Sequence, residues 1–97
     1  MDSFPFTPEE LLPALKLDLA ISAEAFDDRL KARITTAMER ITREGATLAA
    51  TESDRDLVLM YAAYLWRERV TGAEMPRMLR YALNNRVLGQ AAEVTTT

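Results

Sequence analysis

Three acidic pairs come closest in type and spacing to general acid–base chemistry: Glu9/Glu10, Asp27/Asp28 and Asp54/Asp56. Paired carboxylates do such chemistry by converging on one reacting group. Neighbouring residues of a helix point about 100° apart, so the first two pairs do not converge. Each pair also lies early in a predicted helix, where the helix dipole stabilises negative charge. We therefore interpret these acids as helix-stabilising residues.

Composition excludes most of the other enzyme classes. The chain of 97 residues contains no histidine and no cysteine. This excludes zinc sites built from those residues, cysteine nucleophiles, disulfides and the usual base of a serine triad. Only three glycines occur, so no glycine-rich phosphate loop can be drawn. The sequence predicts a protein that is not an enzyme and that uses no metal or other cofactor.

The overall balance is that of one globular domain spanning residues 1–97. Hydrophobic residues make up 48% and charged residues 28% of the chain. The longest apolar run, Leu57 to Trp66, is half the length of a membrane span. The N-terminus has no basic region followed by an apolar stretch, so no signal peptide is predicted. We expect synthesis and folding in a cytoplasm and no membrane partner.

The spacing of apolar and capping residues predicts an all-α fold of about four helices. The first begins at the capping box Thr7-Pro8-Glu9-Glu10, with proline at the first helical position. Phe6 and Leu11 are placed to close it as a hydrophobic staple. Pro13 lies inside this helix, where proline costs roughly 3 kcal/mol. We therefore expect a short or kinked helix that ends near Leu17.

A second helix is predicted from an N-cap at Ser22 to about Glu44, with Gly45 as its stop. Its apolar stripe recurs at steps of three and four residues: Phe26, Leu30, Ile34, Met38 and Ile41. Its basic residues lie mostly off that stripe: Arg29, Lys31, Arg33, Arg40 and Arg43. The pattern predicts an amphipathic helix whose basic side faces solvent or a partner.

A third helix follows the small-residue loop 45–53, with Ser53 as its cap and Gly72 just beyond its end near Val70. Its Leu57–Trp66 segment is apolar on every side. Such a helix is buried by its neighbours, so we expect the other helices to surround the helix at 57–70.

The fourth predicted helix runs from Pro76 to about Leu88 and is stopped by Gly89. Its inner face is expected to contain Met75, Met78, Leu79, Ala82 and Leu83. Residues 89–97 are predicted to form a flexible tail that orders on binding.

The other face of the fourth helix is the candidate partner interface. Its proposed contact residues are Arg77, Arg80, Tyr81, Asn84, Asn85 and Arg86. An ordinary solvated face mixes glutamate with lysine, whereas this one contains arginine, tyrosine and asparagine and no acid. Arginine and asparagine also read DNA bases, but a helix-turn-helix needs a basic footprint and this chain has a pI near 4.9. A plain solvated face and a DNA-binding helix at 76–88 remain as alternatives.

Charge is distributed unevenly along the chain. Residues 1–28 carry seven acids and one lysine, a balance of −6, whereas residues 29–97 carry eleven basic and eight acidic residues, a balance of +3. Two interpretations stay open. The acids stabilise helix N-termini and keep the protein soluble, or the acidic end of one subunit meets the basic side of another.

Four segments together resemble the head–tail connector (adaptor) proteins of long-tailed phages and prophages. They are residues 15–18 (LKLD), 26–30 (FDDRL), 59–65 (LMYAAYL) and 75–86 (MPRMLRYALNNR). The resemblance spans residues 7–88 in order and spacing, and the last segment is its most specific part.

The resemblance implies a small all-helical structural subunit of the virion neck. Such subunits form a closed ring, expected to be dodecameric, under the portal protein. The ring binds a tail-side stopper or tail-completion protein below and lets DNA pass through its channel. The alternative function is a small helical prophage regulator that binds DNA through the helix at 76–88.

Overall fold

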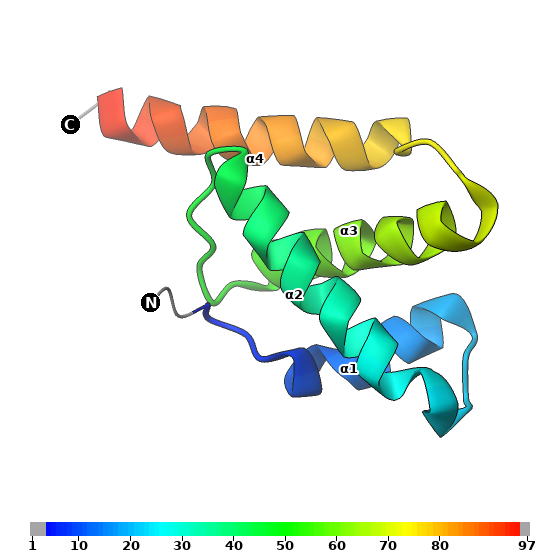
Figure 1. Ribbon diagram of the computed structural model, residues 1–97. Helices are drawn as coiled ribbons and strands as arrows, with labels where there is room; N and C mark the ends of the chain where they lie inside the picture. Colours follow the sequence, from blue (N-terminus) through cyan, green and yellow to red (C-terminus); the bar gives the residue numbers. More distant parts are fainter. Residues whose placement is uncertain (1–3, 96–97) are drawn as a thin grey trace.

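The computed structural model describes the backbone of residues 4–95 and the side chains of residues 4–90. The described residues form four α-helices and one short 3-10 helix and contain no strand (Figure 1). The elements are α1 (Pro8–Leu19), η1 (Glu24–Phe26), α2 (Asp27–Arg43), α3 (Glu52–Thr71) and α4 (Arg77–Thr95). The predicted all-α fold of four helices is confirmed.

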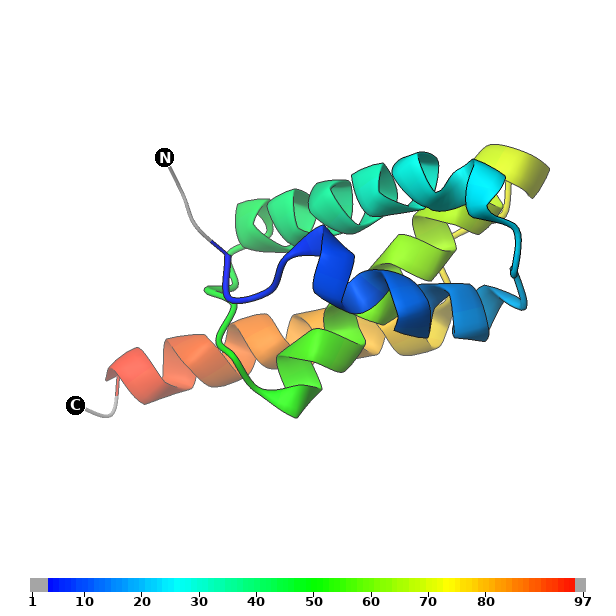
Figure 2. The same ribbon diagram turned by 90° about the horizontal axis from the view of Figure 1, so that it is seen from below.

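Helix α3 is the centre of the fold, since it packs against α1, α2 and α4. Helices α1 and α4 lie on opposite sides of the molecule, with α2 and α3 between them (Figure 1). Seen from below, α1 is near the viewer and α4 lies behind α3 (Figure 2). The molecule therefore presents two separate outer helices.

The central apolar segment is buried only in part, since Met60 is 38% exposed and both Tyr64 and Trp66 are partly buried. Within α3 the buried side chains are Asp54, Leu57, Val58, Leu59, Tyr61, Ala62, Ala63 and Leu65. They pack with buried residues of the neighbouring helices, such as Leu15, Ile34 and Leu83. Truncating one of these leucines to alanine is expected to cost about 2–5 kcal/mol.

Helix α1 begins at the predicted capping box. The side chain of Thr7 accepts a hydrogen bond from the Glu10 backbone N–H, and the Glu10 carboxylate accepts one from the Thr7 N–H. The helix continues past Pro13 to Leu19, so the predicted end near Leu17 is two residues short. It ends at Ala20, which adopts a left-handed conformation with φ 57°.

The predicted cap of α2 is wrong. Ser22 caps no helix, because the chain first makes the 3-10 turn η1, and α2 then begins at Asp27 with no side-chain cap. A hydrogen-bonded ion pair of 2.7 Å between Lys16 Nζ and Asp27 Oδ1 ties this turn to α1. The apolar stripe of α2 is buried except for Phe26, which lies at its edge and packs edge-to-face on Trp66. The end of α2 agrees with the prediction, since Gly45 follows it with φ 116°.

The cap of α3 is Thr51 and not Ser53. Thr51 has an extended backbone, and its hydroxyl accepts a hydrogen bond from the Asp54 N–H. Ser53 therefore lies inside the first turn. The end of α3 at Thr71, closed by left-handed Gly72, lies one residue beyond the prediction.

Helix α4 departs most from expectation. It continues through Gly89 to Thr95, so the predicted stop and the irregular tail from residue 89 are wrong as far as Thr95. Residues 96–97 of the predicted tail lie outside the described residues. Met78, placed on the inner face by the sequence, is 74% exposed, whereas Leu79 and Leu83 are buried as predicted.

Candidate partner-binding surface

The side of α4 that points away from the core is exposed along the described part of the helix. We call it the α4 outer face; it consists of Arg77, Met78, Tyr81, Asn84, Asn85 and Leu88. Three of these are large apolar or aromatic side chains: Met78 is 74% exposed, Tyr81 61% and Leu88 66%. They recur at steps of three and seven residues, so they share one side of the helix. No acidic residue belongs to this face.

Four of the six predicted contact residues belong to the α4 outer face: Arg77, Tyr81, Asn84 and Asn85. Arg80 is also exposed but lies at the flank of the helix, where its Nη1 is 3.3 Å from Oε2 of Glu44. Both side chains of that pair are nearly half exposed, so the contact contributes little to stability.

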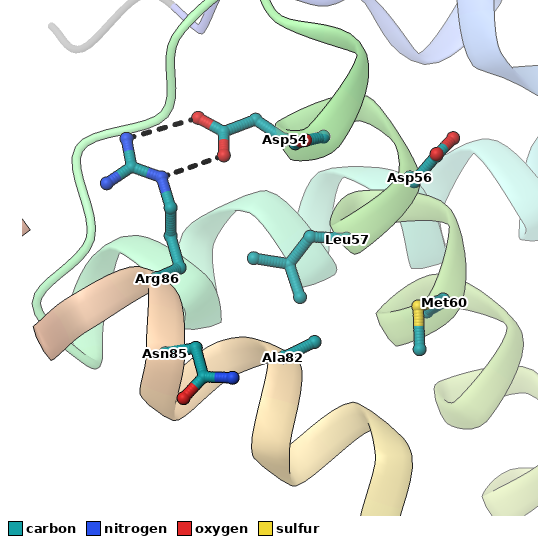
Figure 3. Close-up of a pocket in the computed structure, with 8 residues that line it drawn as sticks. Asp54, Asp56, Leu57, Met60, Ala82, Asn85 and Arg86 are labelled. Carbon is teal, nitrogen blue, oxygen red and sulfur yellow. Dashed lines mark hydrogen bonds and ion pairs between the residues drawn. The ribbon is translucent and has the colours of Figure 1, made fainter. Parts of the chain in front are cut away.

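Arg86, the sixth predicted residue, points the other way and binds within the chain (Figure 3). Its Nε donates a 2.8 Å hydrogen bond to Oδ1 of Asp54, and its Nη2 donates one of 3.2 Å to Oδ2. The same Nη2 donates to the carbonyl oxygen of Thr47 at 2.7 Å. One guanidinium thus joins α4 to the first turn of α3 and to the loop before it.

Asp54 is the one buried charged residue among the described side chains, with 2% of its surface exposed. Burial alone would raise the pKa of its carboxyl group. Hydrogen bonds from the Arg86 guanidinium and from the Ala49 N–H, together with the positive charge of Arg86, outweigh burial and hold the pKa below 3.8. The carboxylate is therefore charged at neutral pH, and both of its oxygens accept hydrogen bonds.

Gln90 provides a second connection that sequence analysis did not anticipate. Its Oε1 accepts a 2.7 Å hydrogen bond from the Thr47 N–H, and its Nε2 donates to the Gly45 carbonyl at 3.2 Å. Arg86 and Gln90 lie one turn apart on the inner side of α4. Together they fasten the helix to the loop between α2 and α3, on both sides of Gly89 in sequence.

A groove of about 450 Å³ opens between α3 and α4 beside this connection (Figure 3). Its walls contain Ser53, Asp54, Asp56, Leu57, Met60, Ala82, Asn85 and Arg86. Its lining is mostly apolar. Asn85 belongs both to the groove and to the α4 outer face, so the two form a continuous surface.

The opposite side of the molecule also exposes an apolar residue. Leu17 on α1 is 81% exposed, the most exposed of the large apolar side chains in the described part of the chain. A hollow beside it is lined by Leu12, Pro13, Lys16, Leu17, Ile21 and Asp27.

The described residues hold no group of three acidic side chains placed to bind a metal ion. Within the same part of the chain, no helix has the length and apolar character needed to cross a membrane. Comparison with known protein families, with curated proteins and with solved structures finds no match to this chain.

Proposed function

We propose that this chain is a head–tail connector (adaptor) subunit of a long-tailed phage or prophage. In this proposal it has no enzymatic activity and acts in the virion neck. It forms a ring, expected to be dodecameric, under the portal protein, and a tail-side stopper or tail-completion protein docks below. The sequence resemblance over residues 7–88 suggests this role, and the α4 outer face is the structural observation that supports it.

The α4 outer face has the composition of a contact surface. Tyrosine and arginine are the residue types that most often anchor protein interfaces. Three large apolar or aromatic side chains on one side of one helix, with no acid among them, differ from the scattered apolar residues of an ordinary solvated surface. In this proposal Tyr81 and Met78 are the anchors, and Arg77, Asn84 and Asn85 add polar contacts at the rim.

The position of this face suits a protein that joins two partners. Helices α1 and α4 lie on opposite sides of the subunit, and each exposes apolar side chains (Figure 1). A connector must bind one protein above and another below. We assign the α4 outer face to one of these contacts.

The direct test is sedimentation of the purified protein, alone and mixed with the portal protein encoded nearby. A complex with the portal, with the mass of a ring, is the expected result. A double variant with Tyr81→Ser and Met78→Ser should stay folded but no longer form that complex. Val70→Ser is the matched control, because Val70 is 65% exposed but lies on α3.

Either of two results would overturn this proposal. One is the lack of any association with the portal at all salt concentrations. The other is tight binding to duplex DNA with a steep salt dependence, the signature of phosphate contacts, which would make the chain a regulator instead. If the α4 variant associates like the wild type, the connector role stands but α4 loses its place in it.

A further inference from the structure

Four arginines lie in a line along one side of α2. They are Arg29, Arg33, Arg40 and Arg43, which we call the arginine stripe. Successive members are four, seven and three residues apart, which places all of them within about 80° of one another around the helix. The stripe is about 21 Å long at 1.5 Å per residue.

The arginine stripe has no acidic partner within the part of the chain whose side chains are described. Ion pairs there involve other basic residues: Lys16, Lys31, Arg80 and Arg86. Both lysines of the protein thus form ion pairs, whereas the four arginines of α2 form none with the described side chains. Glu39 and Glu44 border the stripe, so its four positive charges exceed the neighbouring acids of the helix and its C-cap by two, in a chain with a net charge of −3.

The C-terminal end of the arginine stripe borders a hollow of about 230 Å³. It is lined by Arg40, Arg43, Glu44 and Tyr61. The carboxylate of Glu44 is already held by Arg80 of α4 at 3.3 Å. The two arginines at this hollow are therefore available to an acidic group from outside the subunit.

The acidic complement is in the α1–η1 segment that precedes α2, where Asp18 lines a hollow together with Arg67 of α3. Asp18 at the end of α1 and Glu24 in η1 are exposed and form no ion pair with the described side chains. Lys31 shows the direction of α1, since its Nζ is 3.9 Å from Oε2 of Glu9. Lys31 points about 200° around the helix from Arg29. The stripe thus faces away from α1. Of the acids of α2 itself, Glu39 borders the stripe at four residues from Arg43, but it forms no ion pair with the described side chains.

We propose that the arginine stripe binds the acidic α1–η1 segment, Asp18 and Glu24, of a second copy of this chain. The two surfaces consist of different residues on different elements, so the contact is head-to-tail and each copy offers one surface of each kind. Repetition of such a contact closes into a ring when the rotation permits. The inference rests on the proposed connector function, because it names the contact that would hold the ring together.

Charge favours a second copy over nucleic acid as the partner. A protein with a net negative charge repels the phosphates of nucleic acid at long range. The acidic residues of a second copy carry the charge opposite to the arginine stripe, and every copy of the chain supplies them. Residues 1–28 contain seven acids, more than Lys16 and Lys31 can neutralise. Association through the stripe should therefore weaken as salt is added.

The test is a charge exchange measured by sedimentation of the full chain alone. One variant combines Arg40→Glu with Arg43→Glu, and the other combines Asp18→Arg with Glu24→Arg. Arg40→Glu with Arg43→Glu removes the net positive charge of the stripe, and Asp18→Arg with Glu24→Arg reverses the charge of the acidic surface. Self-association of either variant alone should therefore weaken by roughly tenfold or more. An equimolar mixture should associate again, because in an alternating assembly the introduced glutamates meet the introduced arginines and the unchanged stripe meets the unchanged acids. Arg55→Glu with Arg69→Glu, both on α3, is the matched control and should associate like the wild type.

The inference is overturned by a wild-type chain that stays monomeric at low salt, or by variants whose mixture does not associate. It is also overturned if Arg40→Glu with Arg43→Glu abolishes binding to a DNA duplex and leaves self-association unchanged. The connector function fails separately. A chain that self-associates through the stripe without binding the portal would keep this inference and lose the proposed role in the neck.

Discussion

Asp54 and Arg86 lie 32 residues apart in sequence and form a hydrogen-bonded ion pair, with Arg86 Nε 2.8 Å from Asp54 Oδ1. The pair joins the start of α3 to the middle of α4. The Asp54 carboxylate is almost fully buried, whereas the Arg86 side chain is 26% exposed. A buried charge that loses its partner is costly, so this contact fixes where α4 lies against the rest of the fold.

Replacing Arg86 should therefore destabilise the protein strongly. Arg86→Met keeps much of the aliphatic stem but leaves the Asp54 carboxylate buried without its cation, and we expect a loss of about 3 kcal/mol or more. Urea unfolding followed by circular dichroism measures this. Arg80→Met is the matched control on the same helix, because its exposed pair with Glu44 should contribute less than about 1 kcal/mol. Equal losses for the two variants would contradict this account of Arg86.

The same pair predicts a loss of stability in acid. The pKa of Asp54 is lowered in the folded state, so its contribution is fully present above the ordinary value of 3.8 and is lost as pH falls through the lower folded pKa. Asp54→Asn lacks this titration. The difference in unfolding free energy between the wild type and Asp54→Asn should shrink as pH falls below about 4. A difference that stays constant from neutral pH into this range would rule the linkage out.

The Asp54–Arg86 pair also shows where sequence analysis stops. The sequence predicted the number of helices, the apolar stripe of α2 and the central position of α3, because these follow from local periodicity and capping. No local signal connects Arg86 with Asp54, since their meeting depends on how α4 crosses α3. Arg86 therefore looked like a surface residue of an acid-free helix face, and the structure places it inward instead.

The wrong ends and caps have local physical causes. Ser53 and Thr51 are both good capping residues two positions apart, and the backbone conformation at Thr51 decides between them. Gly89 was predicted to stop α4, but glycine only weakens a helix interior, and Arg86 and Gln90 hold the helix on both sides of it. Met78 was assigned to the core because it is apolar, whereas Leu79 and Leu83 set the buried direction. Which apolar side of α4 meets α3 is a long-range property.

Gly89 yields a prediction about the length of α4. It lies inside the helix, and a Cβ added there would meet no atom within 4 Å. Gly89→Ala should therefore stabilise the protein by about 0.5–1 kcal/mol. Gly72→Ala is the control of opposite sign, because Gly72 has φ 72° and a side chain is strained there. Thermal unfolding of both variants checks this. If Gly89→Ala destabilises the protein as Gly72→Ala does, the helix does not continue through residue 89.

Ala20 offers a second stabilising change, at the end of α1. It has the left-handed conformation, with φ 57°, and its N–H donates to the carbonyl oxygens of Leu17 and Lys16. A Cβ in this conformation costs about 1 kcal/mol, and glycine removes the cost. Ala20→Gly should therefore raise the free energy of unfolding by up to about 1 kcal/mol. The greater conformational entropy of glycine in the unfolded chain reduces this gain. Ala23→Gly is the control, because Ala23 has an ordinary φ of −70° and should lose stability on the same change. Urea unfolding of both variants decides the matter, and an equal loss in the two would show that the cap of α1 carries no strain.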